Sequence, residues 1–239
     1  MQSKTKLKFR HELKYYVNYH QYYLIRQRLR FLLKLDAHAN DRGEYHIRSI
    51  YFDDIENKAL QEKQDGIENR HKYRIRMYNK NDKIIHFEKK IKRNTFIAKE
   101  KVSIPRKTLD KLLVNDYTIL ENEQTPLLQE VHYEMKNRML RPKVIVDYVR
   151  EAYVADTGNV RITFDKNLRT GLNKINPFDP SLYLVQALDD PFYILEVKYD
   201  EYIPNYIREA LQLNGLQRQA ASKYTICRKF IKENSWEDQ

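Results

Sequence analysis

Cysteine, glycine and proline are all scarce in this chain of 239 residues, which has one Cys, five Gly and seven Pro. Because Cys227 is alone, no disulfide can form within the chain, and a reducing compartment is the expected environment. The few Gly and Pro residues exclude a low-complexity tract or a flexible linker, and the composition does not shift along the chain. We therefore expect a single domain over residues 1–239.

Long apolar runs are also missing. No segment approaches the roughly 20 apolar residues that span a bilayer, and residues 1–8 lack the apolar stretch of a signal peptide. These absences predict a soluble, cytoplasmic protein. Charge of one sign is in excess, since 44 Lys and Arg against 33 Asp and Glu give a net charge of +11. The partner is therefore expected to be an anion: nucleic acid, an acidic membrane or a polyphosphorylated small molecule.

Several catalytic signatures are absent as well. The chain has no Gly-x-x-x-x-Gly-Lys-Ser/Thr loop, which excludes a P-loop enzyme. It has neither a Gly-x-Ser-x-Gly motif nor a Cys/His pairing typical of acyl transfer. The seven His residues show no spacing typical of a metal site.

Eight segments have the character of β-strands, and most alternate charged and apolar residues with a period of two. These segments are 7–17, 45–52, 72–78, 84–92, 96–104, 143–154, 160–168 and 192–199, of which 45–52 and 143–154 are more uniformly apolar. Helical spacing of apolar residues predicts helices at about 18–36, 55–64, 106–114, 124–138, 204–213 and 222–233. The pattern predicts an α+β fold.

The charged faces of these strands carry pairs of charges two residues apart. The pairs are Glu12/Lys14, Arg74/Arg76, Glu88/Lys90, Lys99/Lys101 and Glu196/Lys198. Antiparallel sheets commonly turn such faces to water. Alternatively, the amphipathic helices cover the apolar faces from outside, and the charged faces line the lumen of a closed antiparallel eight-stranded barrel. The number of helices favours the barrel. Placing so many cations in a narrow lumen costs free energy, and that cost is offset when the lumen is hydrated and binds a slender polyanion, such as polyphosphate or a nucleoside triphosphate.

A series of motifs adds a resemblance to a known family. The motifs are Phe9-Arg10-His11-Glu12-Leu13-Lys14-Tyr15, Ser49-Ile50-Tyr51-Phe52-Asp53, Tyr73-Arg74-Ile75-Arg76-Met77-Tyr78, Phe87-Glu88-Lys89-Lys90, Asp147-Tyr148-Val149-Arg150, Val160-Arg161-Ile162-Thr163-Phe164-Asp165, Leu195-Glu196-Val197-Lys198 and Ser222-Lys223-Tyr224. Over nearly its whole length the chain resembles the VTC domain, the polyphosphate polymerase branch of the triphosphate tunnel metalloenzymes. The resemblance implies a tunnel of eight antiparallel strands. It also implies an enzyme that passes the terminal phosphate of ATP to a growing polyphosphate chain.

The resemblance implies roles for residues at matching positions. The implied catalytic residues are Lys14, Arg74, Arg76, Arg150, Arg161 and Lys223. The implied substrate-binding residues are Lys90, Lys99, Lys101, Tyr148, Lys198 and Ser222. Glu196 would hold the metal cofactor, Mn²⁺ or Mg²⁺, while Glu12 and Glu88 are expected to be salt-bridge partners of the lysines. Asp147 and Asp165 are expected to orient neighbouring side chains.

Two departures from related patterns matter. The hydrolytic relatives in the superfamily carry Glu-x-Glu-x-Lys on the first strand, and Arg10 stands here at the first Glu position, which favours the polymerase branch. Eukaryotic VTC proteins attach regulatory and transmembrane domains that this sequence lacks. We therefore expect a stand-alone domain of prokaryotic type, with any membrane-protein partner supplied by another chain.

Three alternatives remain open. One is a hydrolase of triphosphate or polyphosphate with the same fold, and another is a polyphosphate sensor without turnover. The third is a nucleic-acid-binding barrel, since basic charge and 19 Tyr would allow base stacking. The Tyr residues are scattered over helices and apolar faces, however, so ATP and inorganic polyphosphate are the expected partners and nucleic acid is not.

Overall fold

The computed structural model describes residues 7–188 and 192–234. Eight long strands dominate it, and all eight lie where the alternating pattern predicts them. They are β1 (Arg10–Val17), β3 (Glu44–Asp53), β4 (Arg70–Tyr78), β5 (Ile85–Arg93), β6 (Phe96–Ser103), β7 (Arg141–Ala155), β8 (Val160–Thr170) and β10 (Tyr193–Tyr199). Two short strands, β2 (Lys34–Leu35) and β9 (Val185–Gln186), pair with β7 and β8 at the edges. Strands of two residues are too short to show any period, and none was predicted there.

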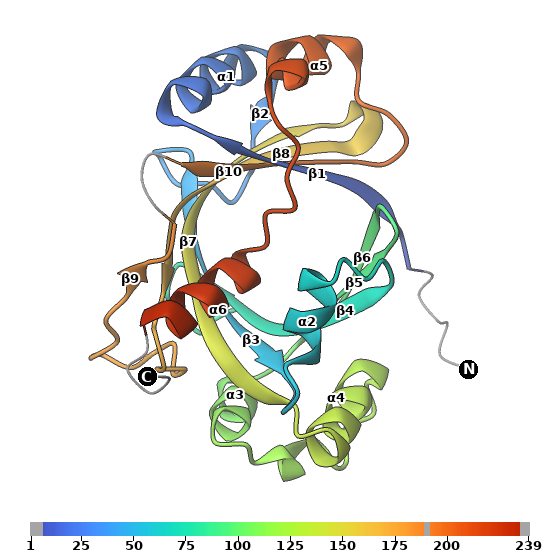
Figure 1. Ribbon diagram of the computed structural model, residues 1–239, viewed down its shortest axis with the longest axis vertical. Coiled ribbons are helices and arrows are strands. Elements are labelled where there is room, and N and C mark those ends of the chain that lie inside the picture. The colour runs from blue at the N-terminus through green and yellow to red at the C-terminus, as the bar shows by residue number, and fades with distance from the viewer. Residues whose placement is uncertain (1–6, 189–191, 235–239) are drawn as a thin grey trace.

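The long strands form a ring in which every pairing is antiparallel (Figure 1). Their order is β7-β3-β4-β5-β6-β1-β10-β8, and β8 pairs again with β7. The predicted closed, eight-stranded antiparallel barrel is therefore confirmed.

Six α-helices flank the barrel within the described residues. They are α1 (Tyr19–Leu32), α2 (Lys58–Gln64), α3 (Arg106–Leu113), α4 (Pro126–Asn137), α5 (Asn205–Leu211) and α6 (Lys223–Asn234). Asn18 caps α1 through a reciprocal pair of side-chain hydrogen bonds with Gln21, at 2.9 and 3.0 Å. The predicted end of α1 near Asp36 is wrong, because the chain turns at Leu33 and enters β2. No helix in the described ranges is long and apolar enough to cross a membrane.

Helices cover the apolar faces of the strands from outside, at opposite ends of the molecule (Figure 1). On one side α1 and α5 pack over β1, β8 and β10, where Leu29, Ile207 and Phe164 belong to one buried apolar cluster. On the other side α3 and α4 pack over β4 and β5, where Leu109 and Phe87 belong to a second buried apolar cluster. Because both outer faces are buried under helices, the charged strand faces turn inward, and an arrangement with those faces in bulk water is excluded.

β8 departs from strict alternation after Asp165. Asn167 has a φ of 53°, and the β7–β8 register shifts nearby, which marks a β-bulge. Strict alternation over residues 160–168 predicts Leu168 on the outer face with Phe164. The bulge instead turns Leu168 to the inner side, where it packs with Ile194 and Cys227.

α2 and α6 lie across one mouth of the barrel, and the chain that leads into α6 crosses the same opening (Figure 1). That chain is anchored to β1, because the Gln219 amide donates to the Lys14 carbonyl at 2.9 Å. Tyr224 of α6 is buried in an apolar cluster with Val146 and Tyr148 of β7, and its hydroxyl donates to Asp53. This docking brings the first residues of α6 to the lumen.

Candidate functional site

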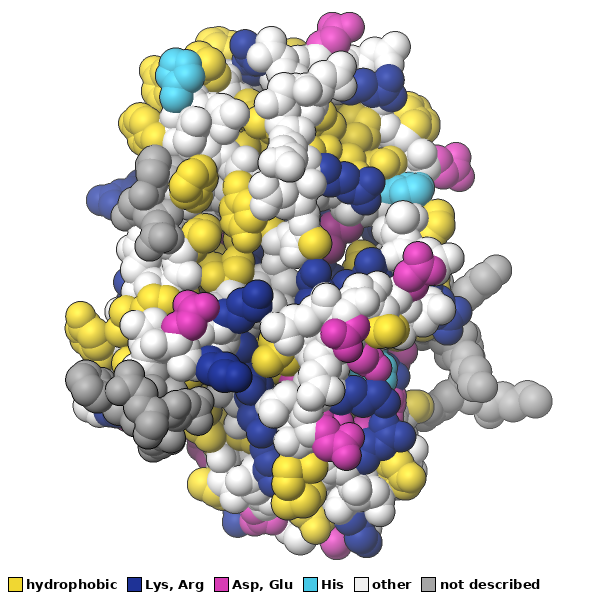
Figure 2. Space-filling view, viewed as in Figure 1, with side chains coloured by type: hydrophobic (Ala, Val, Ile, Leu, Met, Phe, Trp, Pro, Cys, Tyr) yellow, Lys and Arg dark blue, Asp and Glu magenta, His cyan; other side chains and the backbone are white. Residues whose placement is uncertain are grey.

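The barrel holds a cavity of about 810 Å³. Among the described residues, sixteen Lys and Arg side chains line it, against only two carboxylates, Glu12 and Glu196. Figure 2 shows the molecule hollowed near its centre, with Lys and Arg side chains around the opening. So large an excess of positive charge in a confined space is suited to a polyanion.

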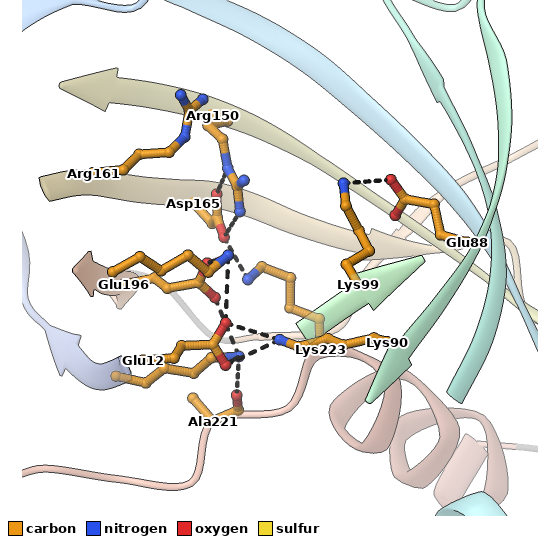
Figure 3. Close-up of polar contacts among 12 residues, drawn as sticks. Glu12, Glu88, Lys90, Lys99, Arg150, Arg161, Asp165, Glu196, Ala221 and Lys223 are labelled. Carbon is orange, nitrogen blue, oxygen red and sulfur yellow. Dashed lines mark hydrogen bonds and ion pairs between the residues drawn. The ribbon is translucent and has the colours of Figure 1, made fainter. Parts of the chain in front are cut away.

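Glu12 of β1 and Glu196 of β10 lie within a cluster of lysines (Figure 3). The Lys198 Nζ atom is 2.5 Å from Glu196 and 3.3 Å from Glu12. The Lys14 Nζ atom is 3.3 Å from Glu196 and 3.7 Å from Glu12. Lys90 of β5 reaches both oxygens of Glu12, at 2.8 and 2.9 Å. The two carboxylates therefore share Lys14 and Lys198, and Glu12 binds Lys90 in addition.

The lysines control the ionisation of both carboxyls. Burial alone would raise the pKa of Glu196, but Lys198 and Lys14 hold that pKa well below its usual value. Burial and Glu196 would likewise raise the pKa of Glu12, yet the lysines lower it to about 2. Burial lowers the pKa of Lys90 to about 7. Both carboxylates are thus ionised at neutral pH, while Lys90 can change its charge there.

Asp165 of β8 orients two further cations, as the sequence led us to expect. Arg150 approaches both of its oxygens, at 2.6 and 2.8 Å, and Lys223 forms an ion pair with it (Figure 3). Burial would raise the pKa of Asp165, but Arg150 and Lys223 lower it to about 2. Both cations also approach the Tyr148 ring, at 5.4 and 5.0 Å from its centroid. Tyr148 and Asp165 together hold these groups at the lumen wall.

Glu88 of β5 is the centre of a third group. Arg74 binds one Glu88 oxygen through Nε and Nη2, at 2.7 and 2.6 Å, and Lys99 binds the other at 2.8 Å. The Arg74 guanidinium also donates to the Tyr51 hydroxyl at 2.9 Å. Burial would raise the pKa of Glu88, but Arg74 and its neighbours hold it well below the usual value. Burial lowers the pKa of Lys99 to about 8.

Arg76 of β4 differs from these cations because it has no acidic partner within 4 Å in the part of the chain that the structure describes. Its guanidinium is buried and reaches only two hydroxyls, Ser49 at 3.3 Å and Tyr148 at 3.1 Å. A buried cation that contacts no carboxylate directly is costly, although Glu88 acts on Arg76 from a greater distance. Its charge is therefore available to an anion that enters.

The structure brings together all but one of the phosphate-binding residues implied by the sequence. Arg161 lines the cavity, donates to the Tyr45 hydroxyl at 2.8 Å and pairs with Asp36. Ser222 lines it at the start of α6. Lys101 is exposed and does not line the cavity. Its strand β6 pairs with β1 only through its first two residues, so the later part of β6 lies beyond the point where the ring closes.

Seven cations that line the cavity were not among the predicted site residues. They are Lys8, Arg10, Lys63, Arg70, Lys72, Lys92 and Arg218. Arg70 and Lys72 continue the alternation of Arg74 and Arg76 towards the start of β4, and this period was the available signal. Lys63 and Arg218 lie outside the barrel strands, on α2 and on the chain before α6, where no strand pattern points to them.

The carboxylates of the lumen offer a place for a divalent cation. No group of three His, Cys, Asp or Glu side chains suited to a metal occurs among the described residues. Glu12 and Glu196 are nevertheless close enough to share Lys14 and Lys198. Mg²⁺ typically takes one or two protein carboxylates and completes its shell with phosphate oxygens and water. The pair therefore fits such an ion, and Glu12 stands beside Glu196 as a second candidate ligand.

Comparison with known proteins agrees with this geometry. Residues 9–232 match the VTC domain family, and no curated protein matches the sequence. HpAC1 from Hippeastrum, a putative adenylyl cyclase described as having a dominant triphosphatase activity, has a similar structure. Its TM-score is 0.55 at 12% identity, over 93% of this chain and 95% of its own. A putative adenylate cyclase from Bacillus halodurans has a TM-score of 0.54 at 11% identity, over 90% and 95%. At these identities the likeness concerns the fold alone.

Proposed function

The chain belongs to the VTC domain family, with the fold of the triphosphate tunnel metalloenzymes, and on this premise we propose that it is a metal-dependent polyphosphate polymerase. The enzyme transfers the terminal phosphate of ATP to the end of a polyphosphate chain in the lumen and releases ADP. The observation that carries the proposal is the inward-facing excess of cations, above all the unpaired Arg76.

Phosphoryl transfer asks mainly for positioning and for neutralisation of charge. A terminal oxygen of the polyphosphate chain attacks the γ-phosphorus of ATP, and the bond from that phosphorus to the bridging oxygen of ADP breaks. The acceptor is already an anion, so no general base is required. Guanidinium groups such as Arg74, Arg76 and Arg150 bind phosphate oxygens in a fork geometry and hold the two reactants in line. A divalent cation at Glu12 and Glu196 would neutralise charge on the phosphates.

The first strand supports transfer to phosphate over hydrolysis. Arg10 occupies the position where hydrolytic relatives carry a glutamate, and its Nε atom lies 2.7 Å from Asp200. A guanidinium cannot ligate a metal ion, so this end of β1 contributes no third carboxylate to Glu12 and Glu196. The metal site that remains suits one cation shared with the substrate.

The decisive experiment incubates the purified protein with ATP and Mn²⁺ or Mg²⁺ and resolves the products on a urea gel. A polymerase yields a ladder of polyphosphate chains and an equivalent amount of ADP. Free phosphate without longer chains would identify a hydrolase instead. Tight binding of polyphosphate without any turnover would identify a sensor.

Arg76→Gln is expected to weaken ATP binding about tenfold without lowering the midpoint of thermal unfolding. The substitution removes a charge that binds phosphate but has no acidic partner, so the fold loses little. Arg74→Gln is the matched comparison, because it leaves Glu88 with Lys99 alone and should lower that midpoint. Calorimetric titration and thermal melts measure the two effects. Unchanged affinity in Arg76→Gln would show that ATP does not bind in the lumen.

A further inference from the structure

One mouth of the tunnel carries cations that the proposed reaction does not require. We call these residues the mouth cations: Lys63, Arg70, Lys72, Lys92 and Arg218. Lys63 lies on α2 and Arg218 on the chain before α6, while Arg70 and Lys72 lie near the start of β4 and Lys92 near the end of β5. Figure 1 shows α2 and the chain before α6 across this opening of the barrel. None of them forms an ion pair with a carboxylate in residues 7–188 or 192–234. The lumen cations Arg74, Arg150 and Lys198, by contrast, each bind a carboxylate.

Two pairs of like charges face each other directly across β4 and β5 at this mouth. Arg70 stands opposite Lys92, and Lys72 stands opposite Lys90. Like charges directly opposite on neighbouring strands destabilise a sheet. Further along the same strands the arrangement is the favourable one, since Arg74 stands opposite Glu88. The unfavourable pairs are therefore confined to the end of the sheet that forms the mouth.

The mouth cations also act on one another. Burial lowers the pKa of Lys72 well below its usual value, and Arg70 lowers it further. Burial and then Arg70 lower the pKa of Lys63 and of Lys92 in the same way. Native proteins keep unfavourable local arrangements, such as neighbouring like charges, mainly at functional sites. Here an anion would relieve the repulsion.

The mouth is continuous with the lumen. Lys72 donates to the Ser222 hydroxyl at 3.3 Å and lies 4.8 Å from the centre of the Tyr224 ring. Lys223, which follows Ser222 in the chain, pairs with Asp165 at the lumen wall. A path of donors therefore runs from the mouth, past the start of α6, to the groups that would bind the reacting phosphates.

We propose that the mouth cations form a second subsite, which holds the part of a polyphosphate chain that extends beyond the reacting phosphates. The inference rests on the proposed function, because it identifies the ligand as a linear phosphate chain. Bases of a nucleic acid would need exposed rings for stacking. The aromatic rings among the residues that line the cavity are buried or half-buried, so a chain of phosphates alone suits this mouth better.

The test compares two anions of different length, tripolyphosphate and long-chain inorganic polyphosphate, by calorimetric titration at constant ionic strength. Lys63→Gln combined with Lys92→Gln is expected to weaken binding of the long chain about tenfold, because two phosphate contacts are lost. Binding of tripolyphosphate should change about twofold at most, because more distant charges are screened. The dependence of long-chain affinity on salt should also become shallower, by about 1.5 units in the logarithmic slope, because each lost phosphate contact accounts for roughly 0.7 to 0.9.

Lys107→Gln combined with Lys136→Gln is the matched control, since both lysines are exposed on α3 and α4, away from the cavity. This control should leave both affinities unchanged. The subsite would be overturned if the mouth variant lost as much affinity for tripolyphosphate as for the long chain. It would also be overturned if the control variant lost as much affinity for the long chain as the mouth variant. A single-stranded oligonucleotide that binds more tightly than polyphosphate, and depends on Lys63 and Lys92, would overturn the choice of ligand.

The gel assay separates this inference from the proposed function. If the wild-type protein makes polyphosphate and the mouth variant binds the long chain as tightly, only the subsite is wrong. If binding of the long chain depends on the mouth but no polymer forms from ATP, the polymerase proposal fails and the subsite stands.

Discussion

Glu196→Gln is expected to lower the turnover of ATP by about 10²–10³-fold while most of the affinity for polyphosphate is retained. The amide has nearly the shape of the carboxylate but carries no charge, so it cannot hold a divalent cation as the carboxylate does. Lys14 and Lys198 keep Glu12 as a partner in the variant, so the cluster does not lose both counter-ions. Polyphosphate binds the same lysines, and the loss of one negative charge from the lumen does not weaken that binding.

The measurement separates turnover from binding. ADP release gives kcat at several Mn²⁺ concentrations, and calorimetry gives the affinity for polyphosphate without ATP. Glu12→Gln should show the same loss if Glu12 and Glu196 hold one ion together. Asp165→Asn is the comparison, because Asp165 is a buried carboxylate behind the lumen surface that binds Arg150 and Lys223. It should weaken substrate binding without raising the Mn²⁺ requirement. Full activity in Glu196→Gln would refute the metal assignment.

The direction in which the cations face was predictable because it depends on local periodicity. Alternation in β4 places Arg74 and Arg76 on one face and Ile75 on the other, and the helices cover the apolar face. A bulge defeats this prediction, because one extra residue in a strand moves the side chains after it to the opposite face of the sheet, as happens at Leu168. Lys101 shows a second limit. The closure of the ring depends on how far β6 pairs with β1, and no local pattern reports that length.

The partners of the cations were less predictable than their direction. Lys90 and Glu12 lie on β5 and β1, which do not pair with each other, so their contact depends on the curvature of the whole barrel. A paired cation such as Arg74 and an unpaired one such as Arg76 have the same sequence pattern, although they differ in energetic cost. Two of the mouth cations, Lys63 and Arg218, were missed for a related reason. Lys63 reaches the cavity from a helix whose position is set by tertiary packing.

Binding of long-chain polyphosphate is expected to weaken by about 10- to 100-fold as the pH rises from about 6 to about 9. The pKa of Lys90 is lowered to about 7 and that of Lys99 to about 8, with burial as the main cause of both shifts. Above these values the free protein must take up a proton on each lysine to bind phosphate, at a loss of up to about tenfold per pH unit for each group. The internal phosphates of a long chain keep their charge over this pH range, so the protein determines how steeply the affinity falls with pH.

Stability of the free protein should change in the opposite direction over the same range. Lys90 has a pKa of about 7 in the folded protein and 10.5 as its ordinary value, so the unfolded chain binds more protons between these limits. The free energy of unfolding therefore rises with pH there, by on the order of 1 kcal/mol per pH unit at most. Lys90→Arg keeps its charge at every pH tested, so it should flatten both trends and bind tightly at pH about 9. Equal slopes in the wild type and in Lys90→Arg would show that Lys90 does not bind the chain.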